Sequence, residues 1–483
     1  MTFPSTATPP ALDGRETVVL RLRARSAGRP PVAPETVDGD TPGAGGARPW
    51  RVQLLAGAVL AALVLLRRPA STFLWDAHDY FAGSRALVGG GSVVHDGRLD
   101  LRGVLTAFLY APAALVSQVA GRDLAGIAVL AENAVILALI GVVVLPRFVG
   151  IWREVTPRVV ISCAIGVGVT LAGFTPFPMS DVPAAGLVVL VILGVDRRTW
   201  PALLGAGLAA GAAINIRPAM LVPLMAVGLA VLVARRWRAG WYLLGTAAGL
   251  VPQLLLNAWT HTGGLLPVPA QTGWLTGLQA HFASHLVRYD TVVGAGPDVR
   301  PTLYWCSPGM VQSLDGRLPS STGELAGAYL THLPQSVVFS LQKVGAAVHW
   351  PLSTPYFTPS PGQDALFAVM ITGVTVVGIA ALVRRTVRAG RAASLGQVAT
   401  LIAVAGTVVG LMTSATETRF AVPLVLVGVA GCALLVGDRV RLRAGRLWVA
   451  GALIAVVGVY GIGVTGLQHP TDTAPAAEAC ATS

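Results

Sequence analysis

The chain of 483 residues is too apolar to be a water-soluble globular protein, because 54% of its residues are hydrophobic and 12% are charged. Its formal net charge is +12. Much of the excess arginine falls in the N-terminal tail and in short segments between apolar runs. This is the positive-inside pattern of membrane proteins rather than a nucleic-acid-binding surface. The composition predicts a multi-pass plasma-membrane protein, and its bias toward Ala, Gly, Val and Arg indicates a high-GC bacterium.

The chain begins with a polar region. Residues 1–51 are rich in Pro, Gly, Thr and Arg and lack a sustained apolar period. They predict a disordered cytoplasmic tail without a cleavable signal peptide. Apolar runs then recur over residues 52–466, which we interpret as one membrane domain, and residues 467–483 form a tail on the outer side.

Eleven apolar runs approach the length of about 20 residues that a membrane helix needs. They cover residues 52–68, 124–145, 159–175, 181–196, 200–215, 218–234, 241–258, 364–383, 395–412, 420–437 and 447–466. The sequence therefore predicts an all-α polytopic membrane protein of about eleven transmembrane helices.

The apolar segment 103–121 leaves two alternatives, a twelfth span or an interfacial or re-entrant helix. A span here would place the basic loop from Arg147 to Arg158 outside, against the positive-inside rule. The interfacial alternative keeps the basic loops and the N-terminus in the cytoplasm. It also predicts a first outer loop at 67–123, a long outer loop at 259–363 and an outer C-terminus.

This topology gathers unusual polar residues on the outer face. Convergence of acids and cations on one side favours a catalytic cavity over dispersed loop solvation. The candidates are Asp76, His78, Asp79 and Tyr80 in the first outer loop, then Arg102, Asp181, Arg217, Glu417 and Arg419.

Short motifs follow one another along residues 52–437 in the order Asp76-x-x-x-Tyr80, Gly89-Gly90-Gly91, Arg102, Leu109-Tyr110-Ala111-Pro112, Met179-Ser180-Asp181, Ile216-Arg217-Pro218, Asn257 to Gly264, and Glu417-x-Arg419-Phe420-x-x-Pro423. This order resembles that of the GT-C glycosyltransferases. It is most similar to the bacterial aminoarabinose-transferase and protein-mannosyltransferase-like branch, which takes sugar from polyprenyl phosphate. The chain departs from that branch at Asp76-Ala77, where a tandem acidic pair is frequent, and at Arg102-Gly103-Val104, where Lys/Arg-Pro-Pro is frequent.

Sugar transfer from a lipid phosphate to a hydroxyl requires a base that takes the hydroxyl proton. The resemblance implies that Asp76 is this catalytic residue, with Asp79 as the second candidate. The alternative is that both aspartates cap the start of an interfacial helix, where Asp is favoured. Tyr80 and His78 are expected to contact substrate beside them.

The departing phosphate is best met by arginine, whose planar fork pairs phosphate oxygens. Arg102, Arg217 and Arg419 are the candidates; the alternative is that they extend to lipid headgroups. Glu417 lies close enough in sequence to hold Arg419 by an ion pair. Asp181 is either a helix cap or, as the resemblance implies, a carboxylate that orients arginines or polar groups beneath the base.

No cofactor is required by these patterns. The outer histidines lack the close spacing of a metal-ligand motif, although a divalent cation (Mg²⁺ or Mn²⁺) bridging Asp76, Asp79 and the donor phosphate remains an alternative. No Gly-rich loop of the nucleotide-binding type is present in the sequence. Cys306 and Cys480 both fall outside the predicted spans and are a candidate disulfide pair.

We therefore predict an inverting glycosyltransferase that moves sugar from a polyprenyl-phosphate donor to a hydroxyl at the outer face of the plasma membrane. The acceptor is a glycan, glycolipid, protein or metabolite, and membrane lipids are the other partners. One alternative is a transporter or lipid flippase, which would favour repeat symmetry and charges near mid-membrane. Another is an inactive GT-C relative that serves as an assembly partner.

Overall fold

The structure is a computed structural model, and its chain divides into two units, Met1–Gly46 and Ala47–Ser483. All described residues belong to the second unit, so residues 1–48 of the predicted tail lie outside them, as does Cys480. The described residues are 49–93, 102–120, 123–260, 282, 285–287, 304–314, 321–349, 355, 361–437 and 446–471.

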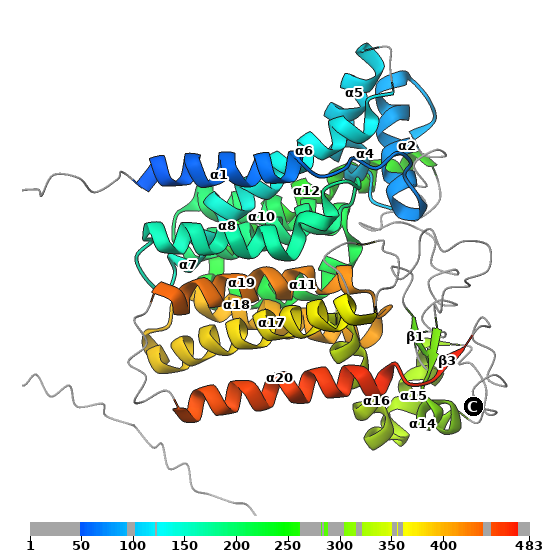
Figure 1. The fold of residues 1–483 in the computed structure, drawn as a ribbon, viewed down its shortest axis with the longest axis vertical. Helices are drawn as coiled ribbons and strands as arrows, with labels where there is room; N and C mark the ends of the chain where they lie inside the picture. Colours follow the sequence, from blue (N-terminus) through cyan, green and yellow to red (C-terminus); the bar gives the residue numbers. More distant parts are fainter. Residues whose placement is uncertain are drawn as a thin grey trace, which may run out of the picture. The chain divides into compact units, whose positions relative to one another are not determined.

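Each of the eleven predicted apolar runs overlaps a helix over most of its length, and these helices run side by side in a bundle (Figure 1). Segments of this kind can bury their backbone groups in lipid because a helix satisfies its own hydrogen bonds. The bundle helices are α1 (Pro49–Leu65), α6 (Ala125–Leu139) continuing through a π-helical turn (Ile140–Val144) into α7 (Leu145–Val149), α8 (Pro157–Leu171), α9 (Asp181–Asp196), α10 (Trp200–Ile216), α11 (Leu221–Arg235), α12 (Ala239–Thr260), α17 (Pro361–Ala389), α18 (Leu395–Thr413), α19 (Val422–Gly437) and α20 (Arg446–Gly466).

Seven helical stretches within the described residues are long and apolar enough to cross a membrane. They confirm an all-α polytopic membrane protein. The stretches are Ala125–Val149, Pro157–Phe174, Pro218–Thr260, Asp364–Ala392, Leu395–Thr413, Thr418–Val436 and Trp448–Gly466, and α1 and α10 contain shorter apolar helices.

The described residues of the segment 103–121 form two short helices, α4 (Leu105–Leu109) and α5 (Ala111–Val119), separated at Tyr110. At 1.5 Å per residue, neither helix approaches the roughly 30 Å of a bilayer core. This geometry favours the interfacial alternative over a twelfth span.

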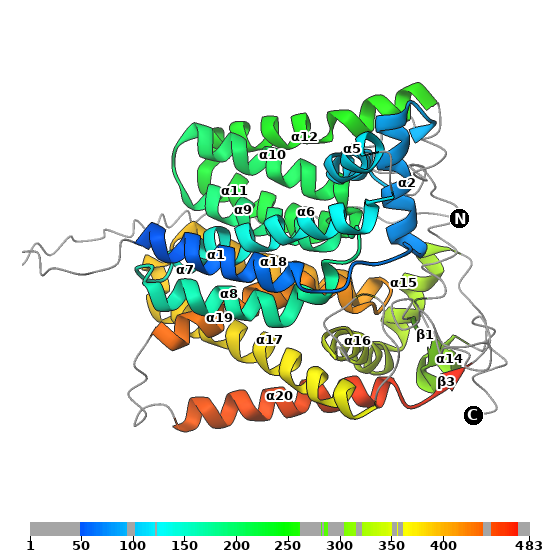
Figure 2. The ribbon, with the colours of Figure 1, turned by 45° about the horizontal axis from the view of Figure 1, so that its top comes forward.

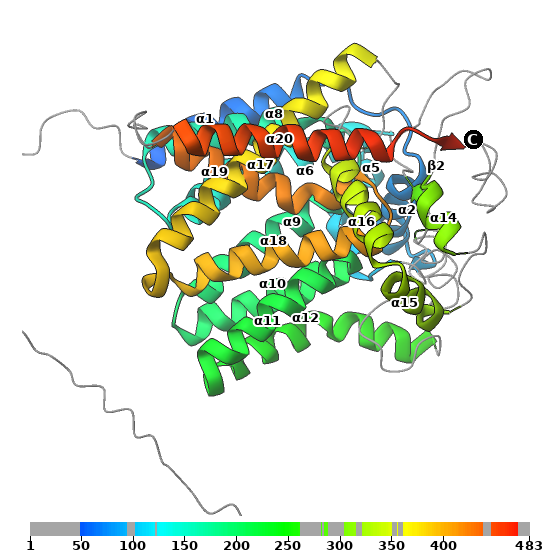
Figure 3. The same cartoon turned by 90° about the horizontal axis from the view of Figure 1, so that it is seen from below.

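The short elements gather at one end of the bundle, as all three ribbon views show (Figures 1, 2 and 3). They include α2 (Trp75–Gly89), α4 and α5 from the first loop. From the described parts of the long loop come α14 (Pro308–Ser313), α15 (Thr322–Thr331) and α16 (Leu333–Val348). The two loops that the sequence assigns to the outer face therefore share one end of the bundle.

A small antiparallel sheet adds strands to the predicted all-α fold. It contains β1 (His285–Val287), β2 (Tyr304–Cys306) and β3 (Pro470–Thr471) in the order β1-β2-β3. His285 pairs with Cys306 and Tyr304 with Thr471, so the long loop is joined to the C-terminal residues. Cys306 is disulfide-bonded, whereas Cys163 and Cys432 are free thiols.

Helices α10 and α12 pack closely through glycines spaced four residues apart. A Cβ on Gly207 would lie 2.0 Å from the carbonyl oxygen of Tyr242, and one on Gly245 would lie 2.2 Å from that of Leu204. Small residues at this spacing let membrane helices approach backbone to backbone. The close approach brings polar side chains near the ends of both helices to the same region of the bundle.

Candidate functional site

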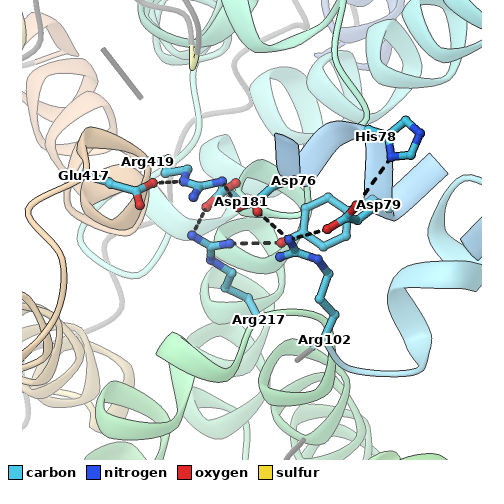
Figure 4. A network of polar contacts seen from close by, with 9 residues as sticks. Asp76, His78, Asp79, Arg102, Asp181, Arg217, Glu417 and Arg419 are labelled. Carbon is cyan, nitrogen blue, oxygen red and sulfur yellow. Dashed lines mark hydrogen bonds and ion pairs between the residues drawn. The ribbon is translucent and has the colours of Figure 1, made fainter. Parts of the chain in front are cut away.

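Asp76 stands at the centre of a charged network at the end of the bundle where the short elements gather (Figure 4). One of its carboxylate oxygens accepts a hydrogen bond from Arg102 at 2.5 Å, and the other is ion-paired with Arg419. Asp76 lies in the first turn of α2, whose N-cap is Leu74 and carries no side-chain cap bond. Its carboxylate therefore faces two arginines and does not cap the helix.

Arg102 joins the two aspartates of α2. The same terminal nitrogen lies 2.9 Å from an oxygen of Asp79, and the guanidinium lies 4.8 Å from the centre of the Tyr80 ring. Residues 76, 79 and 80 share one face of the helix, as spacings of three and four residues require. This face presents both acids and the aromatic ring to one arginine.

His78 lies on the other side of α2. Its side chain is 67% exposed, and Nδ1 is 3.4 Å from a carboxylate oxygen of Asp79. Figure 4 shows the imidazole pointing away from the arginines. The structure therefore places His78 at the margin of the network rather than within it.

Arg217 forms the base of the network at the break between α10 and the short helix Pro218–Met220. Its guanidinium lies 2.9 Å from an oxygen of Asp181, donates to the Tyr80 hydroxyl at 3.1 Å and lies 4.4 Å from the centre of the Phe420 ring. Arg217 is 5% exposed and Asp181 1% exposed. A buried arginine with these partners does not extend to lipid headgroups.

Arg419 approaches Asp76 from the opposite side, on a short helical turn (Thr418–Ala421) before α19. Its Nε is ion-paired with Glu417, and both residues are buried. The backbone N–H of Thr416 donates to the carbonyl of Val287 at 2.9 Å, so strand β1 is attached to this turn. The long loop therefore helps to hold Arg419 in position.

The network keeps Asp76 and Arg102 ionised. Burial alone would raise the pKa of Asp76, but Arg419, Arg102 and Arg217 outweigh it and hold that pKa well below its usual range. Burial alone would lower the pKa of Arg102, but Tyr80, Asp76 and Asp79 raise it. The three arginines face four carboxylates, so the ion pairs include one excess negative charge.

Arg102 is positioned by contacts that the sequence prediction missed. The N–H of Val104 donates to Gln253 and that of Leu105 to Asn215, each at 2.9 Å. A Cβ on Gly103 would lie 1.5 Å from the carbonyl oxygen of Asn215, so only glycine fits there. Gln253 is fully buried in an apolar helix. A polar amide within an apolar run could have indicated such a contact from the sequence, because buried polar groups require partners.

A second set of hydrogen bonds positions Asp181. The Tyr110 hydroxyl lies 2.8 Å from the carbonyl oxygen of Met179 and 3.0 Å from the Asn133 side-chain oxygen. The Asn133 amide in turn donates to the carbonyls of Thr175 and Phe177. These bonds fix the turn that leads into α9, at whose first residue Asp181 lies.

The carboxylates do not converge as metal ligands. Both oxygens of Asp76 face arginines, and Asp79 faces Arg102. Among the described residues, no group of three His, Cys, Asp or Glu side chains is arranged to hold a metal ion. The divalent cation (Mg²⁺ or Mn²⁺) that would bridge Asp76, Asp79 and the donor phosphate stays an untested alternative.

Comparison with known proteins leaves the family open. No protein-family model matches the sequence, and no curated protein matches it. Among solved structures, the fold is similar to the crystal structure of the Archaeoglobus fulgidus oligosaccharyltransferase complex with Zn and sulfate, at 14% identity and a TM-score of 0.44. The match covers 87% of this chain, and the chain spans 53% of the length of that protein.

Proposed function

We propose that this protein is a membrane glycosyltransferase of the GT-C type that moves a sugar from a polyprenyl-phosphate donor to an acceptor hydroxyl. The observation that carries the proposal is the position of Asp76 between Arg102 and Arg419. A carboxylate can take the hydroxyl proton, and guanidinium groups can hold the departing phosphate. Sugar transfer from a lipid phosphate needs both groups within reach of one bond.

The donor phosphate and Asp76 compete for the same two guanidinium groups in this mechanism. With one excess negative charge already in the network, a bound phosphate is best accommodated when the carboxylate gives up its arginines. The pKa of Asp76 then rises toward its ordinary value, because the cations that hold it down have new partners. The donor thus turns a firmly held carboxylate into a stronger base.

The reaction is an inverting single displacement. The acceptor oxygen forms a bond to C1 of the sugar as the bond from C1 to the phosphate oxygen breaks. The electron pair of that bond leaves with polyprenyl phosphate, which Arg102 and Arg419 hold, and the acceptor proton passes to Asp76. Glu417 and Asp181 keep Arg419 and Arg217 oriented throughout, since each is ion-paired with its arginine.

The proposed site lies at the outer face of the plasma membrane, with the N-terminus in the cytoplasm and the C-terminus outside. Support comes from the exposed arginines between α9 and α10 and between α11 and α12, which lie at the other end of the bundle (Figure 3). Basic loops favour the cytoplasmic side. A glycan, glycolipid, protein or metabolite hydroxyl on the outer side is then the acceptor.

Sugar release from a labelled donor tests this proposal. Full-length protein in vesicles is given radiolabelled polyprenyl-phosphate mannose or arabinose, with octyl glucoside or water as the acceptor. Asp76→Asn should lower the rate by about 10²–10⁴-fold, the usual contribution of a general base. The matched control Glu154→Gln removes an exposed carboxylate from the loop before α8 and should leave the rate unchanged. Movement of the donor lipid without cleavage of its sugar–phosphate bond would instead support the transporter alternative.

A further inference from the structure

Helix α2 has a second surface, opposite the charged network, that lines a cavity. Phe81, Ala82 and Arg85 follow His78 by three, four and seven residues, so the four share a face. That face lies away from the one that carries Asp76, Asp79 and Tyr80. The cavity has a volume of about 610 Å³, and its other walls are Arg68–Phe73 before α2 and Asp123 with residues 125–127 at the start of α6.

The cavity carries positive charge that the described protein does not neutralise. Arg68 and Arg85 line it, and neither forms an ion pair with any residue that the structure describes. Among the described lining residues, the one carboxylate is Asp123, which accepts a hydrogen bond from the N–H of Ala125 at 3.3 Å at the start of α6. The other titratable group among these described residues is His78. An anion is therefore the complementary occupant.

The remaining surface of the cavity is apolar and held in shape. The rings of Phe73 and Phe81 meet edge to face, with centres 4.9 Å apart, and Ile127 is 55% exposed beside them. A Cβ on Gly126 would lie 2.2 Å from the carbonyl oxygen of Ala70. The segment before α2 therefore packs directly on the start of α6, and the apolar wall is fixed by backbone contact.

The cavity lies between the ends of two apolar helices. Its lining includes Arg68, which follows α1, and residues at the beginning of α6, and Figure 2 shows these two helices. The ends of apolar helices are expected at the level of the bilayer surface. Arginines that only extend to headgroups would point outward from such helix ends. Here Arg68 and Arg85 come from different elements and line one hollow together with phenylalanine rings.

We propose that this cavity binds an anionic membrane lipid, with Arg68 and Arg85 on its phosphate and with Phe73, Phe81 and Ile127 against the first carbons of its chains. Arginine pairs phosphate oxygens through its planar fork, and anionic lipid surfaces attract such residues. The site is separate from the charged network, and it does not depend on the proposed transferase activity.

Lipid titration of the full-length protein in detergent tests this site, with binding followed by native mass spectrometry. Dioleoylphosphatidylglycerol should bind at least about tenfold more tightly than dioleoylphosphatidylcholine, because two arginines beside the headgroup favour a lipid with a net negative charge. The double variant Arg68→Gln/Arg85→Gln should lose that preference, and Arg85→Gln alone should lose part of it. Arg67→Gln is the matched control, because Arg67 is adjacent and exposed but does not line the cavity.

Two results would overturn the proposal. One is equal binding of the two lipids by the wild type, and the other is an equal loss of binding in Arg67→Gln and Arg68→Gln/Arg85→Gln. Inorganic phosphate separates a lipid from a free anion as the ligand. If it competes as tightly as phosphatidylglycerol, the apolar wall has no role and the lipid assignment is wrong. Thermal unfolding in phosphatidylcholine micelles should be the same for all variants, because both arginines are exposed.

Discussion

The two ends of the bundle use arginine in different ways. At one end, Arg217 and Arg419 are 5% and 8% exposed, and each is ion-paired with a buried carboxylate. At the other end, the arginines of the short loops are exposed, among them Arg197, Arg198, Arg236 and Arg238. Arg235 there donates to the last carbonyls of α9.

The buried arginines and the exposed arginines serve different purposes. Taking a charged side chain out of water costs several kcal/mol unless partners compensate, so a chain retains buried charges where they serve a purpose. Exposed arginines carry no such cost and are sufficient to orient membrane helices. Burial with a carboxylate partner therefore distinguishes the arginines of the charged network from the exposed arginines of the short loops at the other end.

Replacing one arginine at each end of the bundle tests whether a buried arginine matters for the reaction and an exposed one does not. Arg419→Gln removes a cation that faces Asp76, and we expect sugar release from the labelled donor to fall about 10²–10³-fold, as for loss of one group that stabilises developing charge. Arg238→Gln at the other end should leave the rate unchanged. Equal losses in the two variants would show that arginine burial does not mark the site.

A glycine pair tests how strictly Arg102 must be placed. Gly103→Ala puts a methyl group against the backbone of Asn215, which must displace the loop that carries Arg102. We expect turnover to fall about tenfold to a hundredfold, because a shift of about 1 Å at a catalytic group has effects of this size. Gly205→Ala, on α10 with open space around its Cβ, is the control and should behave as wild type.

The pH dependence of the reaction rate tests the role of Asp76. A carboxylate whose folded pKa is lowered stays ionised until the pH falls below its ordinary value of 3.8, so the acid limb of kcat/KM should lie below that pH. If the donor phosphate takes over the arginines, the acid limb of kcat should lie about one to two pH units higher. Initial rates at saturating donor give the limb of kcat, and those at limiting donor give the limb of kcat/KM. If the two limbs coincide, the donor phosphate does not displace Asp76 from its arginines.

Lys343 is a buried basic residue outside the charged network. It is fully buried in α16, its amine donates to the carbonyl of Phe282 at 2.9 Å, and its contacts with Phe282 and Phe339 are aromatic. Burial lowers the pKa of this amine from 10.5 to about 7. Between these values the unfolded chain binds a proton that the folded chain does not, so stability rises with pH across that window.

Replacement of this lysine should remove the pH effect. We expect the unfolding temperature of the wild type to rise by about 2–4 °C from pH 7 to pH 10, and that of Lys343→Met to stay level, because methionine has no proton to bind. Thermal unfolding in detergent measures the difference. A wild-type unfolding temperature that falls over this range would show that the amine is charged in the folded protein.

The sequence by itself determined where the helices lie and which residue types were available for chemistry. An apolar run of spanning length forms a helix for local reasons, since in lipid each backbone group must find its partner within the segment. For this reason the sequence alone located the apolar runs that correspond to α6, α8 and α18. Motif order likewise identified Asp76, Arg217 and Arg419 as candidates without showing that any of them meet.

Only the tertiary structure decided which partners those residues have. The contact of Gln253 with Val104 joins positions 149 residues apart, and strand β1 reaches the Arg419 turn through the backbone of Thr416. No periodicity encodes such contacts, because they depend on how close α10 and α12 approach and on the path of the loops. The same holds for His78, which belongs to the candidate motif in sequence yet lines a cavity on the side of α2 away from the charged network, because a helix turns 100° at each residue.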